Sequence, residues 1–309
     1  MLDFKGRKVG AILSCNDVQK YIDWLPYAAK AWELNGATPV IILVNHEKIP
    51  DDLKNRGWDI RLLPKLDDRI ISSYIAQIVR QFYAGLLDEY DAIITSDLDT
   101  ICLPSKTFFE RYINESMDES KFIATRYNHD EIFIPWNIAP PHIWREVMGG
   151  ISTVEDVLNA IESIFKQGGG YENVELFKHP NVYYTADQKI LTAQVLNYAK
   201  LGKESKGQVN GYISVNRGTQ PLEMAHHQNY LVPFVNNEKV KILDKLDLYQ
   251  SYITSDGTVI EQGTYQWNHG DKNNITLSDI NPEKHITLGT GNATNFSREL
   301  LDKAFKLFW

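Results

Sequence analysis

Residues 90–104 read Tyr-Asp-Ala-Ile-Ile-Thr-Ser-Asp-Leu-Asp-Thr-Ile-Cys-Leu-Pro, an apolar run that two carboxylates interrupt. Four or five apolar or β-branched residues lead into Asp97 and Asp99, and a second apolar stretch follows them. Such a run predicts a buried strand, which Pro104 ends. Ligands in open α/β sheets bind outside the carboxyl ends of the strands, so both aspartates stand where a ligand site is expected.

The spacing of the two carboxylates indicates a metal site. Because Leu98 lies between them, Asp97 and Asp99 point the same way if the backbone stays extended. Magnesium and manganese prefer oxygen ligands, and often take one or two carboxylates together with substrate phosphates. A purely structural alternative remains, since Ser-Asp and Asp-Thr pairs are also common at helix N-caps and in turns.

Composition excludes several classes of protein. The chain has 309 residues, of which 43% are hydrophobic and 23% charged, as expected for a soluble globular protein. Its net charge of −8 argues against a nucleic-acid partner. The N-terminus lacks the apolar stretch of a signal peptide, and no apolar run is long enough for a membrane span. Cys15 and Cys102 lie in apolar runs, so we expect two reduced core residues in a cytoplasmic protein.

The order of elements before residue 90 predicts a parallel sheet. Strands are expected at 8–15, 38–44 and 59–63, with a helix after the first strand and a long amphipathic helix opening at Asp67. Pro26 suggests that the first helix begins or restarts near Trp24, and Gly36 is its expected end. Strand, helix and strand in this order form βαβ units, whose strands pair in parallel.

Polar and charged residues at other strand ends are candidates for the same site. Ser14, Asn16 and Asp17 stand where the first strand ends. Arg80 falls off the apolar stripe of the long helix, so it faces either the ligand cleft or solvent. Asp187 is expected in the first turn of a helix that follows a strand. It either complements the helix dipole or faces the cleft that holds the aspartate pair.

The pattern changes after residue 200. A polar linker leads into short strand-like pieces and a closing amphipathic helix over 297–308. We therefore predict a core of residues 1–200 and a less regular, β-rich C-terminal extension of residues 201–309 that packs on it. The extension contains several histidines, one of which could complete a metal shell beside the carboxylates. Residues 133–141 are rich in proline, which predicts an irregular aromatic loop.

The segment Ile-Ile-Thr-Ser-Asp-Leu-Asp-Thr-Ile, placed after βαβ and a long helix, resembles the Asp-x-Asp region of GT-A-fold glycosyltransferases. The later Ala186-Asp187-Gln188 before a helix is similar to the acceptor-side acidic motif of that superfamily. The N-terminal part also looks like its members, through Tyr21, Trp24, Trp32, Gly36 and the Pro-Val-Ile-Ile-Leu-Val strand. Over roughly residues 8 to 200, the resemblance implies a Rossmann-like α/β fold with a mixed, mainly parallel sheet flanked by helices.

The resemblance also implies an activity, the transfer of a hexose or pentose from a nucleoside-diphosphate sugar donor to a glycan or other hydroxyl acceptor. Asp97 and Asp99 would hold Mn²⁺ or Mg²⁺ on the diphosphate, where the metal acts as a Lewis acid. Ser14, Asn16 and Asp17 would line the nucleotide pocket.

The remaining site residues also receive roles from the resemblance. Arg80 would contact the pyrophosphate. Asp187 would deprotonate the acceptor, or position the sugar or acceptor in a retaining enzyme. His285, followed by Gly289, loosely resembles a C-terminal metal-binding histidine of some retaining families, although the rest of that motif is absent here. Trp136 could supply an aromatic platform for a sugar.

Two other functions fit parts of the same pattern. Asp97-Leu98-Asp99-Thr100-Ile101 nearly reads as the nucleophile motif of HAD-type phosphatases, in which the first aspartate attacks phosphorus beside Mg²⁺. That family carries the motif on its first strand and needs a later acidic pair, and this sequence shows neither. The other alternative is a carbohydrate-binding or nucleotide-sugar-binding protein that keeps the fold without turnover.

Overall fold

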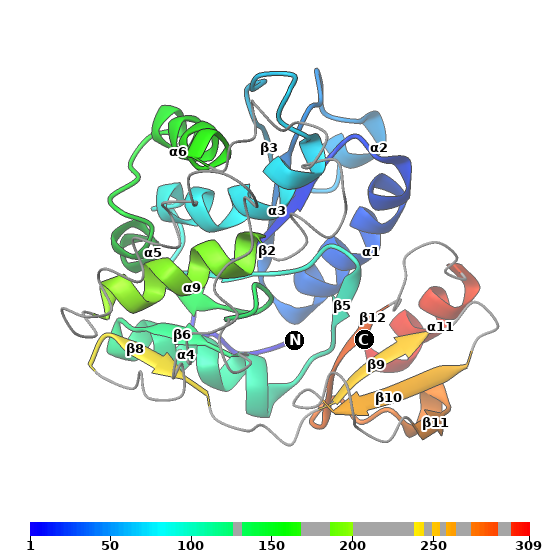
Figure 1. The fold of residues 1–309 in the computed structure, drawn as a ribbon. Helices are drawn as coiled ribbons and strands as arrows, with labels where there is room; N and C mark the ends of the chain where they lie inside the picture. Colours follow the sequence, from blue (N-terminus) through cyan, green and yellow to red (C-terminus); the bar gives the residue numbers. More distant parts are fainter. Residues whose placement is uncertain are drawn as a thin grey trace.

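A computed structural model describes residues 1–125, 132–167, 186–199, 238–243, 249–253, 258–263, 273–289 and 298–309 (Figure 1). Within these residues the chain builds two sheets. One is a seven-stranded sheet in the order β3-β2-β1-β4-β7-β6-β8, and the other is a five-stranded sheet in the order β11-β10-β9-β12-β5.

The seven-stranded sheet is mixed and mainly parallel. Its strands are β1 (Val9–Cys15), β2 (Thr38–Leu43), β3 (Asp59–Leu62), β4 (Ala92–Thr95), β6 (Phe122–Ala124), β7 (Ile138–Ala139) and β8 (Val240–Ile242). β1, β2, β3 and β4 pair in parallel, β7 runs antiparallel between β4 and β6, and β6 pairs in parallel with β8. The predicted fold class, a mainly parallel Rossmann-like sheet flanked by helices, is confirmed.

Helices cover both faces of this sheet. One face packs against α3 (Ser72–Tyr83), α5 (Pro141–Val147), α6 (Val154–Gln167) and α9 (Ala186–Tyr198). The other packs against α1 (Gln19–Asn35), α4 (Arg111–Glu119) and the second sheet. Strand residues alternate between the two cores, as Ile12 and Leu13 do, which is the period of a strand buried on both faces. The described short elements are α2 (Asp51–Lys54), the 3-10 turns η1 (Ala84–Leu86) and η4 (Leu277–Asp279), and the π-turn η2 (Lys106–Glu110).

Residues 90–104 do not form one strand, which corrects the sequence prediction. β4 ends at Thr95, the chain turns at Leu98 and Asp99, and β5 (Thr100–Cys102) begins in the other sheet. At its last residue β4 is still held by the segment that precedes β7, since Trp136 N–H donates to the carbonyl oxygen of Thr95 (2.7 Å). The two aspartates therefore lie on a crossover between sheets, and the extended geometry assumed for them is wrong.

The five-stranded sheet combines β5 with β9 (Tyr249–Ile253), β10 (Val259–Gly263), β11 (Asn273–Ile275) and β12 (His285–Gly289). β12 pairs antiparallel with β5, and α11 (Arg298–Phe308) lies beside this sheet (Figure 1). The five-stranded sheet thus includes β5 from the N-terminal part of the chain, and the seven-stranded sheet includes β8 from the C-terminal part. The division at residue 201 stays a prediction.

Several local predictions need adjustment. α1 begins at Gln19 and carries Pro26 within it, and it ends at Gly36 as expected, in a left-handed conformation with φ 94°. α3 begins at Ser72, five residues after Asp67. The proline-rich segment contains β7, and Pro141 opens α5, where the missing N–H of proline leaves no hydrogen bond unmade.

Candidate functional site

Arg80 on α3 joins two of the predicted acidic residues. Its Nη1 lies 2.8 Å from Asp97 Oδ1, and its Nη2 lies 3.3 Å from Asp187 Oδ2. Nη1 also donates to the backbone carbonyl oxygen of Ser96 (2.7 Å). The side chains of Arg80 and Asp187 are only 8% and 7% exposed, whereas that of Asp97 is 33% exposed. Residues 96–99, between β4 and β5, are called the aspartate turn below. Arg80 is thus a buried cation between this turn and the start of α9.

The elements explain why these side chains meet. α3 and α9 pack on the same face of the sheet, and Gln81 Nε2 donates to the backbone carbonyl oxygen of Asp187 (2.9 Å). Asp187 lies in the first turn of α9, as predicted, and its Oδ1 accepts from the N–H of Gln188 (2.8 Å). Asp97 comes two residues after β4, a central strand of the sheet.

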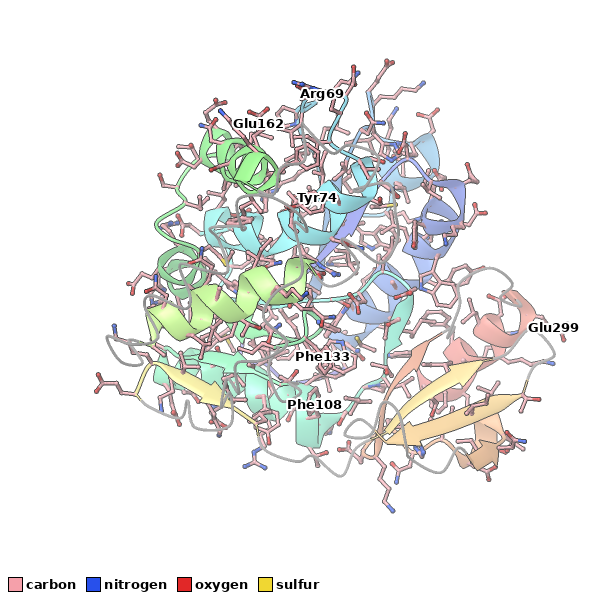
Figure 2. The ribbon with its side chains drawn as sticks, viewed as in Figure 1. Arg69, Tyr74, Phe108, Phe133, Glu162 and Glu299 are labelled. Carbon is pink, nitrogen blue, oxygen red and sulfur yellow. The ribbon has the colours of Figure 1, made fainter. Side chains whose placement is uncertain are left out.

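Both Asp99 and Asp187 sit where the carboxylate form is disfavoured. Burial, followed by the negative charge of Asp97, raises the pKa of Asp99 to about 6. Burial also raises the pKa of Asp187 to about 6; Arg80 opposes this rise and the charge of Asp97 adds to it. Tyr74, labelled on α3 in Figure 2, has its pKa raised by burial and by the nearby Asp187. The three carboxyl groups of Asp97, Asp99 and Asp187 thus outnumber Arg80 and Lys20, the two cations whose charges lower the pKa of Asp99.

This excess of carboxylate is what a divalent cation would relieve. Asp97 has two carboxylate oxygens, so it can hold Arg80 through one and a cation through the other. Asp99 is half-buried, and the charge of Asp97 raises its pKa because the two carboxyl groups are near each other. Paired oxygen donors of this kind suit Mg²⁺ or Mn²⁺.

Ser14, Asn16 and Asp17 form a separate polar group at the end of β1, against the start of α3. Ser14 Oγ donates to the backbone carbonyl oxygen of Ala76. Asn16 Nδ2 donates to Ser72 Oγ (3.3 Å), and Ser72 Oγ donates to Asp17 Oδ1 (3.0 Å). Asn45, which follows β2, donates to Asp17 Oδ2 (2.7 Å). These residues line the carboxyl edge of β1 and β2, which is the edge where Asp97 follows β4.

The structure does not bring His285 to the aspartates. Gly289, at the other end of β12, pairs with Thr100 beside Asp99. The ring Nδ1 of His285 accepts the backbone N–H of Asn281 (2.9 Å). Across the described part of the chain, no three His, Cys, Asp or Glu side chains are grouped so that they could hold a metal ion. Asp97, Asp99 and His285 therefore do not form such a cluster.

Trp136 does not offer a surface to a sugar, which corrects the predicted aromatic platform. Its side chain is fully buried and makes edge-on contacts with Phe108 and Phe109, at 6.2 and 6.1 Å between ring centroids. Trp136 belongs to the core between the two sheets. Cys15 and Cys102 are buried and free, as predicted.

Sequence reasoning missed a set of glutamines around Arg80. Three side-chain oxygens are buried and make no hydrogen bond, those of Gln77, Gln81 and Gln188. The Nε nitrogen of Arg80 is likewise buried without a partner. Gln77 lies three residues before Arg80 on α3, a spacing that places both on one helix face, and Gln81 lies four residues after Gln77. Buried polar atoms without partners are rare and need a reason.

Comparison with known proteins gives only weak similarities. No family model matches the chain, and no curated protein matches it. Among solved structures, it is similar to the glycosyltransferase GlyE of Streptococcus pneumoniae TIGR4, with 16% identity and a TM-score of 0.34 over 60% of this chain and 42% of that one. It is also similar to the galactosyltransferase LgtC in complex with donor and acceptor sugar analogues (14%, 0.28, over 48% and 69%).

A third similar structure is 4-diphosphocytidyl-2C-methyl-D-erythritol synthase, with 14% identity and a TM-score of 0.33 over 50% of this chain and 85% of that one. Two of these three proteins are transferases of sugars by name. Their identities and TM-scores are too low to assign this chain a family or an activity. In the residues that the structure describes, no helix has both the length and the apolar character needed to cross a bilayer.

Proposed function

We propose that this protein is a metal-dependent glycosyltransferase that moves a sugar from a nucleoside-diphosphate sugar to an acceptor hydroxyl. The observation that carries the proposal is Arg80, which ties the aspartate turn to Asp187 within one buried site. A reaction that separates a diphosphate from a sugar needs a cation site for the first and polar partners for the second, side by side.

On the donor side, Asp97 and Asp99 are the proposed ligands of Mn²⁺ or Mg²⁺, and Ser14, Asn16 and Asp17 the proposed lining of the nucleotide pocket. The bound metal would act as a Lewis acid on the leaving diphosphate. Both terminal nitrogens of Arg80 are engaged, Nη1 by Asp97 and Ser96 and Nη2 by Asp187, which favours a structural part over contact with the pyrophosphate. Its proposed part is to fix the two carboxylates relative to each other.

On the sugar side, Asp187 is the proposed acidic residue. A base must expose its carboxylate to the acceptor hydroxyl. Asp187 is buried, and both of its oxygens accept hydrogen bonds, from Gln188 and from Arg80. Its surroundings therefore favour positioning of the sugar over proton abstraction.

Thermal shift against UDP-, GDP- and dTDP-linked sugars, with and without Mn²⁺, tests this proposal. A ligand present at 100 times its Kd stabilises the folded state by about 2.7 kcal/mol. We expect one donor class to stabilise the protein only with the metal, and Asp97→Ala and Asp99→Ala to abolish the effect. Asp88→Ala is the matched control, because Asp88 comes before β4, at the opposite edge of the sheet.

Two results would contradict metal-dependent donor binding by Asp97 and Asp99. One is that none of the donors stabilises the protein while it hydrolyses a generic aryl phosphate, which would indicate the phosphatase alternative. The other is an equal loss of donor binding in the Asp88→Ala control, which would show that the aspartate turn has no special part. Donor binding without sugar transfer would indicate a binding protein.

A further inference from the structure

The residues around the aspartate turn are held from α1 as well as from α3. Trp32 Nε1 donates to Ser96 Oγ (3.0 Å), immediately before Asp97. Asn35, one turn later on α1, donates through Nδ2 to the backbone carbonyl oxygen of Cys102 (2.8 Å), at the end of β5. The same face of α1 therefore holds the chain on both sides of the two carboxylates.

Asn35 is also linked to the far end of the chain. Its Oδ1 accepts a hydrogen bond from Trp309 Nε1 (3.0 Å), just after α11. Asn35 is fully buried, so both ends of its amide group depend on protein partners. Trp309 is held in turn by Phe305, whose ring stacks on it with 5.1 Å between centroids, and Phe305 contacts Tyr27 on α1 (6.2 Å).

The position of Asp99 depends on β5, which it immediately precedes. β5 pairs with β12, and Leu103 N–H donates to the carbonyl oxygen of Ile286 (2.9 Å). Asp97, by contrast, follows β4 and is held by Arg80. The two carboxylates are thus attached to different sheets, and the separation between them depends on how β5 is fixed against α1.

We propose that Trp309 and Asn35 are positioning residues for the aspartate pair. The hydrogen bond from Trp309 fixes the amide of Asn35, this amide fixes β5, and β5 fixes the position of Asp99 relative to Asp97. The inference rests on the proposed metal site, and it adds that the α11 end of the chain controls the affinity of that site. Neither residue touches the carboxylates themselves.

The test is Trp309→Phe, which keeps an aromatic ring on Phe305 and removes only the N–H donor. Its matched control is Trp58→Phe, which removes the hydrogen bond from Trp58 Nε1 to Glu33 of α1 (3.1 Å), a bond that involves neither Asn35 nor β5. The probe is Mn²⁺ alone, titrated by electron paramagnetic resonance. Loss of partners that orient metal ligands weakens affinity by about 10- to 100-fold. We expect at least a tenfold rise in the Kd for Mn²⁺ in Trp309→Phe and no change in Trp58→Phe.

Amide hydrogen exchange separates this inference from the proposed function, because it needs no metal. Faster exchange over 96–104 in Trp309→Phe, with the Trp58→Phe control unchanged, is the expected result. Asn35→Leu, which removes both hydrogen bonds at similar volume, should have the larger effect. Unchanged exchange in both test variants would overturn the positioning role. A wild-type protein that binds no Mn²⁺ would instead overturn the metal site.

Discussion

Arg80 shows how a single side chain can define a site. It is buried, and it holds carboxylates from two elements that are about ninety residues apart in the sequence, Asp97 and Asp187. Position alone left Arg80 open to two readings, because a residue off the apolar stripe of a helix faces solvent more often than a cleft. The partners that turn it inward are distant in the sequence, and no local pattern announces them.

Replacing Arg80 should cost much more stability than replacing a surface arginine. Arg80→Met leaves Asp187 buried without its counter-charge, and removing one partner of a buried ion pair costs about 3–5 kcal/mol. Urea unfolding at pH 7 measures the change in the free energy of unfolding. Arg69→Met is the control, because Arg69 pairs with Asp67 at the surface, where such pairs contribute about 0–1 kcal/mol. An equal loss of unfolding free energy in both variants would show that the ion pairs of Arg80 do not stabilise the fold.

A second charged residue, Asp59 on β3, should make stability depend on acid pH. Arg61 donates to it twice (3.0 and 2.8 Å) and Tyr90 Oη donates once (2.9 Å). Burial raises the pKa of Asp59, but the hydrogen bonds from Arg61 and Tyr90 outweigh it and hold the pKa below its ordinary value. The stabilisation is therefore complete above the unfolded pKa of about 4, and is lost as the pH falls through the lower folded pKa.

Asp59→Asn tests this dependence. We expect it to lower the free energy of unfolding by about 1–2 kcal/mol at pH 7, since hydrogen bonds to a charged group are lost. The difference from wild type should shrink at pH 3, which lies below the unfolded pKa, because protons bound by the carboxyl group of the unfolded chain offset part of the stabilisation. Urea unfolding at both pH values gives the comparison. A difference that stays the same at pH 3 would show that the charge of Asp59 has no part in it.

At the scale of elements, the crossover from β4 to β5 matters most. The apolar pattern predicted the strand before Asp97, but it continued that strand through both aspartates to Pro104. Two apolar stretches in one line look alike whether they belong to one sheet or to two. The partner that separates them, β12, lies about 185 residues later and carries no local signal of its pairing.

The short π-turn after β5 depends on the same distant segment. Glu283, just before β12, accepts hydrogen bonds from the backbone N–H groups of Lys106 (3.1 Å) and Thr107 (2.9 Å). Glu283→Ala should lower the free energy of unfolding by about 1 kcal/mol, the usual cost of losing such a cap. Chemical denaturation measures it, with Glu299→Ala on the exposed face of α11 as control. A change no larger than that of the control would mean that this cap does not stabilise the fold.

At the scale of the whole molecule, the seven-stranded sheet places the candidate residues along one edge. The βαβ order, the end of β1 and the start of α9 could all be predicted, because each rests on local periodicity and on turn residues. Three features could not be predicted: the burial of Trp136, the assignment of β5 and β8 to their sheets, and the position of His285. All three depend on packing between segments far apart in the sequence. The mainly parallel sheet is therefore the firmer prediction, and the assembled site is a result of the structure.

Measurement of donor binding and of turnover in Asp187→Asn and Asp99→Asn tests the proposed function most directly. The sugar nucleotide that stabilises the wild type is titrated with Mn²⁺, and release of its nucleoside diphosphate is followed with acceptor present. We predict that Asp99→Asn loses donor binding, whereas Asp187→Asn keeps it and loses about 100-fold in turnover, as expected for a group that positions the reacting sugar. Donor binding lost in Asp187→Asn and kept in Asp99→Asn would contradict the assignment of the metal to the aspartate turn.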